Sequence, residues 1–92
     1  MAEIERIKVI PLTVPLEDTA GKMTYQELTL KAPSLSQAEK FYEKQASSTS
    51  LAAMRLLIAL VSGTRDSVLQ PMDFIDFRKC EDYLLGFLTW KP

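Results

Sequence analysis

The alternation of apolar and polar residues within residues 7–31 constrains the fold more than any other feature. Apolar side chains occupy every second position from Ile10 to Leu16, and Leu28 and Leu30 alternate with polar residues further along. A period of two describes a strand that buries one face. The two runs flank a short polar segment, so they predict an antiparallel β-hairpin over residues 7–31.

The turn and two prolines refine this prediction. Gly21 lies in the turn, where it can take a positive φ at little cost. Pro11 and Pro15 fall on the parity opposite to the apolar row. Proline donates no hydrogen bond, so the first strand should be an edge strand whose proline side is unpaired. An isolated hairpin is marginally stable in water, so its apolar face must pack on helices. The side chains expected to face those helices are Leu12, Val14, Leu28 and Leu30.

Three segments after the hairpin have the composition of helices. We expect these helices over residues 35–46, 50–62 and 71–88. Ser34 and Gln37 fit a capping box for the first helix, and Ser36 and Glu39 fit one equally well. The hydroxyl-rich connector that follows should provide the N-cap of the second helix, and Gly63 should cap its C-terminal end.

The third helix is expected to begin at Pro71, because a missing N–H costs nothing in a first turn. Asp73 and Asp76 then lie near the positive end of the helix dipole, which favours them. The preceding connector is polar apart from Val68 and Leu69, which should tuck back onto the core. The residues of the third helix expected to point inward are Met72, Ile75, Phe77, Cys80, Leu84, Phe87 and Leu88.

Length and charge narrow the class of protein. A chain of 92 residues has room for one domain, residues 1–92. We expect an α+β fold in which the hairpin packs on a small bundle of about three helices. A formal charge of −1 disfavours a nucleic-acid partner. The longest apolar stretch is too short for a membrane span, and the N-terminus is charged where a signal peptide would be apolar. We therefore expect a cytoplasmic protein.

The residue types that usually serve in catalysis or metal binding predict no catalytic, cofactor-binding or metal-binding site. The chain has no histidine and one cysteine, Cys80, so a zinc site would lack ligands. Neighbouring acids such as Glu81 and Asp82 do not point into one cleft when they lie on a helix. A non-enzymatic protein is the expectation.

The second helix is too apolar to be surrounded by its own small domain. Residues 51–61 are apolar except for Arg55. A helix apolar on all sides is either buried on all sides or meets a partner, and a chain this short has a thin core. Arg55 could lay its stem over apolar surface or pair with an acidic group across an interface. The residues expected to contact a partner are Arg55, Leu56, Leu57, Leu60, Phe74, Phe77 and Trp90.

Several short segments, taken in their order along the chain, resemble a known protein family. The segments are Lys8 to Leu16, the pair Gly21-Lys22, Tyr25 to Lys31, Pro33, the helical run Met54 to Ile58, and the late stretch Val68 to Phe74. In this order they resemble the small tail assembly chaperones of Mu-like and P2-like bacteriophages, over roughly residues 7–88.

This resemblance implies a role in phage tail morphogenesis, in the cytoplasm of the bacterial host. Members of the family are thought to bind the long helical tape-measure protein, to keep it soluble and to help recruit tail-tube subunits. They are absent from the mature virion. Exposed apolar surface on such a protein also favours a homo-oligomer that hides it until the client arrives.

Two other functions fit the residues. One is a structural tail or baseplate component that stays in the virion. The other is a DNA-binding regulator that uses the second and third helices as a helix-turn-helix. The turn between those helices is long for that motif, and Arg78 and Lys79 are the only basic residues of the third helix.

Overall fold

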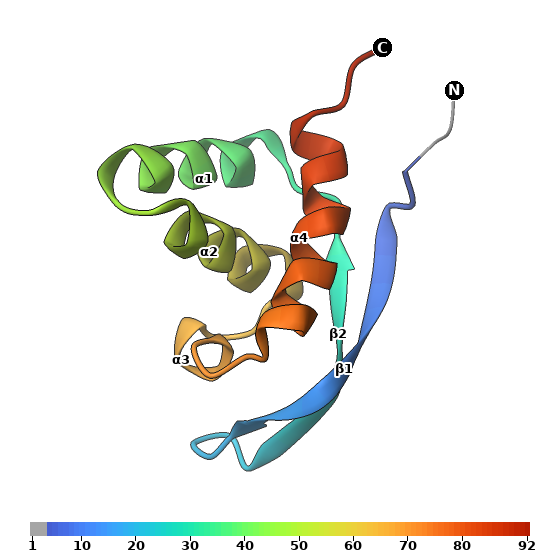
Figure 1. Ribbon diagram of the computed structural model, residues 1–92, viewed down its shortest axis with the longest axis vertical. Helices are drawn as coiled ribbons and strands as arrows, with labels where there is room; N and C mark the ends of the chain where they lie inside the picture. Colours follow the sequence, from blue (N-terminus) through green and yellow to red (C-terminus); the bar gives the residue numbers. More distant parts are fainter. Residues whose placement is uncertain (1–3) are drawn as a thin grey trace.

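The computed structural model describes residues 4–92 and contains a two-stranded antiparallel sheet followed by helices (Figure 1). The elements are β1 (Ile7–Asp18), β2 (Met23–Lys31), α1 (Leu35–Ser47), α2 (Ser50–Ser62), α3 (Asp66–Leu69) and α4 (Phe74–Leu88). In Figure 1 the helices lie to one side of the long, curved hairpin, and α4 runs alongside the strands. This arrangement confirms the predicted α+β fold with an N-terminal hairpin.

The hairpin has two paired regions with an irregularity between them. Ile7 to Pro11 pair with β2 in one register, and Leu16 to Asp18 pair in another, so β1 carries extra residues in between. These extra residues break the period of two. Ile10, Leu16, Leu28 and Leu30 are buried, as the alternation predicts, whereas Leu12 is half-buried and Val14, in the irregular stretch, is 48% exposed. The prediction that Val14 faces the helices is therefore wrong.

Gly21 is needed in the turn because a side chain would not fit there. The residue with positive φ is Lys22, at 54°, and not Gly21 as predicted. The backbone N–H of Gly21 donates to Asp18 Oδ1 at 3.0 Å. A Cβ on residue 21 would lie 2.9 Å from Asp18 Oδ2. Gly21 is required because the Asp18 carboxylate, which also pairs with Arg65, approaches the turn backbone so closely.

The capping residues predicted the start of α1 and both ends of α2. Ser34 and Gln37 form the complete capping box of α1. Thr49 accepts a hydrogen bond from Ala52 N at the start of α2, at 3.0 Å. Gly63 ends α2 in the left-handed region, with φ of 70°. Each signal is local, so no tertiary contact is needed to place it.

The core forms around α2, which packs against α1, β2, α3 and α4. Five of its residues are buried: Ala53, Met54, Leu57, Ile58 and Val61. The hairpin adds its buried leucines and isoleucine, and α4 adds Cys80 and Leu84, both of which are fully buried. A helix contacted by four other elements buries more of its surface than the length of the chain suggested.

The segment before α4 differs from the prediction. The expected connector contains the short helix α3, in which Val68 and Leu69 are buried as predicted. Pro71 lies in a turn, and α4 starts at Phe74 with Asp73 as its N-cap. The inward face differs as well: Ile75 is 65% exposed, against the prediction, and Asp76 is fully buried.

No helix within the described part of the chain is long and apolar enough to cross a membrane.

Candidate partner-binding surface

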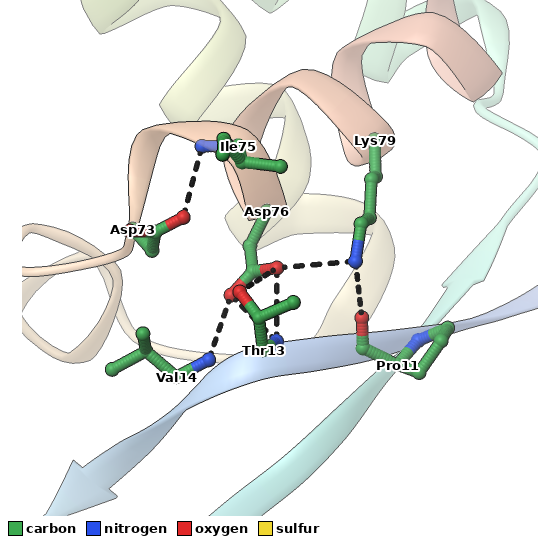
Figure 2. Close-up of polar contacts among 7 residues, drawn as sticks. All are labelled: Pro11, Thr13, Val14, Asp73, Ile75, Asp76 and Lys79. Atoms are coloured by element: carbon green, nitrogen blue, oxygen red, sulfur yellow. Dashed lines mark hydrogen bonds and ion pairs between the residues drawn. The ribbon is translucent and has the colours of Figure 1, made fainter.

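The buried polar residues hold the fold together. Asp76 is fully buried and its carboxylate accepts hydrogen bonds from the backbone N–H of Thr13, at 3.0 Å, and of Val14, at 3.2 Å (Figure 2). Lys79 Nζ lies 3.4 Å from Asp76 Oδ1 and donates to the carbonyl of Pro11. Burial by itself raises the pKa of Asp76, but the hydrogen bonds from Thr13 and Val14 outweigh it and leave the pKa below its usual value. Asp76 is therefore an ionised structural carboxylate.

The single cysteine is also structural. Cys80 is fully buried, and burial raises the pKa of its thiol to about 12, with the charge of Asp76 adding to the rise. The thiolate is the reactive form of cysteine, so this thiol is a weak nucleophile. Within residues 4–92, no group of three His, Cys, Asp or Glu side chains could hold a metal ion.

The first surface feature is an apolar hollow between α2 and the start of α4. This α2–α4 hollow has a volume of about 160 Å³. Among the residues that line it are Leu51, Arg55, Ile58, Met72, Phe74 and Phe77. It therefore brings together three of the residues predicted to contact a partner, from two helices that are far apart in the sequence.

Two stacked aromatic rings form one wall of the α2–α4 hollow. The rings of Phe74 and Phe77 are nearly parallel, with centroids 5.7 Å apart. Phe77 is 9% exposed and supports Phe74, which is 53% exposed. The guanidinium of Arg78 lies 4.7 Å from the centroid of the Phe74 ring. An exposed ring that contacts both Phe77 and Arg78 is a restrained apolar surface, which suits a binding site.

A polar cluster forms the rim of the same hollow. Arg55 Nε donates to Asp66 Oδ1 at 2.6 Å, and Gln70 Nε2 donates to Asp66 Oδ2 at 3.0 Å. The hydrogen bond from Gln70 is the largest effect on the pKa of Asp66, which lies below its usual value although burial opposes the shift. Arg55 thus pairs with an acidic group of its own chain. One of the two expectations was a pair with an acidic group across an interface.

A second, larger hollow lies at the other end of α4. This C-terminal hollow has a volume of about 540 Å³. Residues that line it include Ile4, Pro33, Leu35, Phe87, Leu88 and Trp90. Leu35 is 80% exposed and Trp90 is 54% exposed. Trp90, another residue predicted to contact a partner, therefore lies on a separate surface from Phe74.

The other residues predicted to contact a partner, Leu56, Leu57 and Leu60, belong to α2. Leu57 is fully buried in the core, so its side chain is not available to a partner in this structure. Leu56 and Leu60 are half-buried, and the carbonyl of Leu60 accepts a hydrogen bond from Gln37 Nε2 at 3.5 Å. Neither leucine lines the α2–α4 hollow.

Sequence reasoning missed five residues of the α2–α4 hollow: Leu51, Ile58, Leu69, Gln70 and Met72. Leu51, Arg55 and Ile58 have the spacing i, i+4, i+7, so one face of α2 could have been assigned from periodicity alone. Met72 gave no such signal, because it precedes α4 and its position depends on the turn at Pro71.

Comparison with known proteins gives one match. A family model described as "Phage tail assembly chaperone proteins, E, or 41 or 14" matches residues 9–89. The searches of curated proteins and of solved structures found no match.

Proposed function

Because the chain belongs to the family of phage tail assembly chaperone proteins, we propose that it binds a tape-measure protein and keeps it soluble during tail assembly. The family match, which spans residues 9–89, is the observation that carries this proposal. In this role the protein is not an enzyme. It acts in the cytoplasm of the bacterial host and is not retained in the finished virion.

The α2–α4 hollow is the surface that we assign to this client. A tape-measure protein is a long helical chain, and an amphipathic helix presents its apolar side chains at i, i+3, i+4 and i+7. A hollow with an exposed aromatic wall can receive such side chains from the flank of a helix. Met72 adds an adaptable side chain, because methionine fills irregular gaps more readily than branched residues do.

The polar rim of this hollow supports the same assignment. Interfaces commonly combine an apolar centre with a polar margin, and aromatic residues, methionine and arginine are enriched in them. Phe74 and Met72 supply the centre, while Arg55 and Asp66 supply charged groups at the margin. The ion pair holds the Arg55 stem against the hollow. Arg55 therefore shapes the surface in the free protein and needs no new acidic partner.

The C-terminal hollow offers a second surface for the tail-tube subunits that the family is thought to recruit. It lies at the opposite end of α4 from Phe74, so both partners could be bound at once. Leu35 and Trp90 provide large exposed apolar side chains there. We include self-association in the proposed function, since exposed apolar surface is typical of proteins that assemble with partners or with copies of themselves.

Co-expression with the tape-measure protein of the same phage tests the proposal. We expect the client to be insoluble when expressed alone and to co-purify with this chain in the soluble fraction. A client that stays insoluble and never co-elutes would overturn tape-measure binding. Mass spectrometry of purified virions is the second measurement, and finding this chain in the particle would indicate a structural tail or baseplate component.

A further inference from the structure

The two edges of the sheet differ in how their backbone groups are satisfied. Along the outer edge of β1, α4 supplies the partners. Asp76 accepts from the backbone of Thr13, and Lys79 donates to the carbonyl of Pro11 (Figure 2). Tyr83 donates from its hydroxyl to the carbonyl of Glu5. Side chains of α4 thus satisfy backbone groups at Glu5, Pro11 and Thr13, which opposes pairing with another strand there. Among the described residues, the outward groups of Ile7 and Val9 between them receive no hydrogen bond.

The register identifies the backbone groups that point away from the sheet on β2. Ala32 N donates to the carbonyl of Arg6 at 2.8 Å, which makes their pair a hydrogen-bonded one. Hydrogen-bonded and non-hydrogen-bonded pairs alternate in an antiparallel ladder. The N–H and C=O groups of Glu27, Thr29 and Lys31 therefore point outward from β2. The outward carbonyls of Glu5 and Pro11 on β1 have the same parity and agree with this assignment.

The outer edge of β2 has no such cover. Among the described residues, no hydrogen bond reaches the outward backbone groups of Glu27, Thr29 or Lys31. All three residues are exposed, and neither Glu27 nor Lys31 forms an ion pair within residues 4–92. The edge is thus a row of unpaired donors and acceptors that carries one negative and one positive side chain, two positions to either side of Thr29.

We propose that β2 pairs antiparallel with β2 of a second copy of this chain, with Thr29 opposite Thr29. This register places Glu27 of each copy directly opposite Lys31 of the other. The outward groups of all three residues then form the hydrogen-bonded pairs of the new ladder. Opposite charges and paired threonines are both favourable cross-strand neighbours. The product is a four-stranded sheet in the order β1-β2-β2-β1.

Charge selects this register against its neighbours. Moving the two-fold axis by one residue, to Leu28 or Leu30, leaves Glu27 and Lys31 opposite uncharged residues and loses their attraction. Moving it to Glu27 sets Glu27 against its own copy, and moving it to Lys31 sets two lysines against each other. Like charges directly opposite one another are destabilising. Only the register centred on Thr29 sets Glu27 and Lys31 across from each other. The segment is therefore complementary to itself, as a two-fold interface requires.

This inference rests on the self-association included in the proposed function and names its surface. The surface is separate from the α2–α4 hollow, because none of the residues that line that hollow belongs to β2. Self-association is measured without a client, so its failure would leave tape-measure binding untouched and the two can be told apart.

Charge reversal tests the register. We expect the wild-type chain to show a concentration-dependent monomer–dimer equilibrium by light scattering and sedimentation velocity. Glu27→Lys and Lys31→Glu should each weaken the dimer at least about tenfold, because each creates two like-charge pairs. The double variant restores opposite charges and should bring the dimerisation constant back to within about threefold of wild type. A dimer that is indifferent to the single reversals, or a chain that is monomeric throughout, would overturn the proposal.

Cross-linking gives an independent readout that does not depend on charge. Thr29→Cys places two thiols opposite each other at the two-fold axis, within reach of a disulfide or a short thiol cross-linker. Thr24→Cys is the matched control: it is also an exposed threonine of β2, but its two copies would lie about 30 Å apart. We expect a covalent dimer from Thr29→Cys alone. Equal cross-linking of both variants, or of neither, would overturn the register.

Discussion

Asp76 accepts hydrogen bonds from both the backbone N–H and the hydroxyl of Thr13, each at 3.0 Å, across 63 residues of sequence. A side chain of α4 thus takes the place that a third strand would occupy beside β1 (Figure 2). The contact fixes α4 against β1, whereas no side chain in the described part of the chain hydrogen-bonds to the outward backbone groups of Glu27, Thr29 and Lys31 on β2.

Replacing Asp76 should therefore destabilise the fold. Asp76→Asn removes the charge and places an amide donor where Val14 N–H also donates, so we expect a loss of about 2–3 kcal/mol in the free energy of unfolding. Asp73→Asn is the matched control on the same helix, because asparagine caps as well as aspartate, and it should change stability by less than about 0.5 kcal/mol. Urea denaturation followed by circular dichroism measures both. Similar stabilities for the two variants would contradict the role of Asp76.

The same carboxylate should make stability depend on pH in the acid range. The pKa of Asp76 in the folded protein lies below the ordinary aspartate value of 3.8, and the pKa values of Asp18 and Asp66 are lowered too. A lowered pKa means that the unfolded chain binds protons more readily than the folded protein does. The Asp76 carboxylate therefore makes its full contribution to the free energy of unfolding above pH 3.8, and this contribution is lost as pH falls through the pKa of the folded state. The urea midpoint should be flat above about pH 5 and fall below pH 4. Asp76→Asn should show a smaller fall, and an unchanged pH profile would exclude Asp76 as a source.

Local signals in the sequence predicted much of the fold. The capping box at Ser34, the N-cap at Thr49 and the glycine at Gly63 each act within one turn of helix, so each could be recognised without knowing the tertiary structure. The period of two likewise located both strands. These features depend on the backbone and its nearest side chains.

Features that depend on distant parts of the chain were not predictable in this way. Val14 follows the alternation of apolar residues, but it lies in the irregular stretch of β1. Its side chain is exposed there, and its backbone N–H donates to Asp76. Asp76 fits the helix-dipole explanation, and nothing local to α4 indicates that Thr13 lies beside it. For the candidate site, the sequence identified Arg55, Phe74 and Phe77. It could not separate them from Leu57, because which face of α2 is covered depends on α1, α3 and α4.

Substitutions along α2 should separate its buried face from its surface. Leu57→Ala removes a fully buried side chain and should cost about 2–5 kcal/mol, since it leaves a cavity. Leu60→Ala is a matched change one turn later at a half-buried position, where the cost should stay below about 1.5 kcal/mol. Urea denaturation measures both. If Leu57→Ala were the milder change, the assignment of Leu57 to the buried face of α2 would be wrong.

Cys80 should react only when the protein unfolds. Its thiol is fully buried with a pKa of about 12, so both access and the fraction of thiolate are low in the folded state. We expect Ellman's reagent to label the native protein very slowly and the urea-unfolded protein at once. Leu57→Ala should speed the labelling, because a less stable fold opens more often. Rapid labelling of the native wild type would place Cys80 at the surface.

Phe74 should matter for the client more than an equally exposed aromatic residue elsewhere. Phe74 is 53% exposed on the wall of the α2–α4 hollow, and Tyr42 is 52% exposed on α1, where it packs edge-on against Phe41. Each replacement by alanine removes one aromatic contact, so both should cost a similar, small amount of stability, about 1 kcal/mol. In co-expression, Phe74→Ala should lower recovery of the soluble tape-measure protein several-fold, while Tyr42→Ala should leave it near wild type. Equal effects would show that bulk apolar surface, rather than this hollow, holds the client.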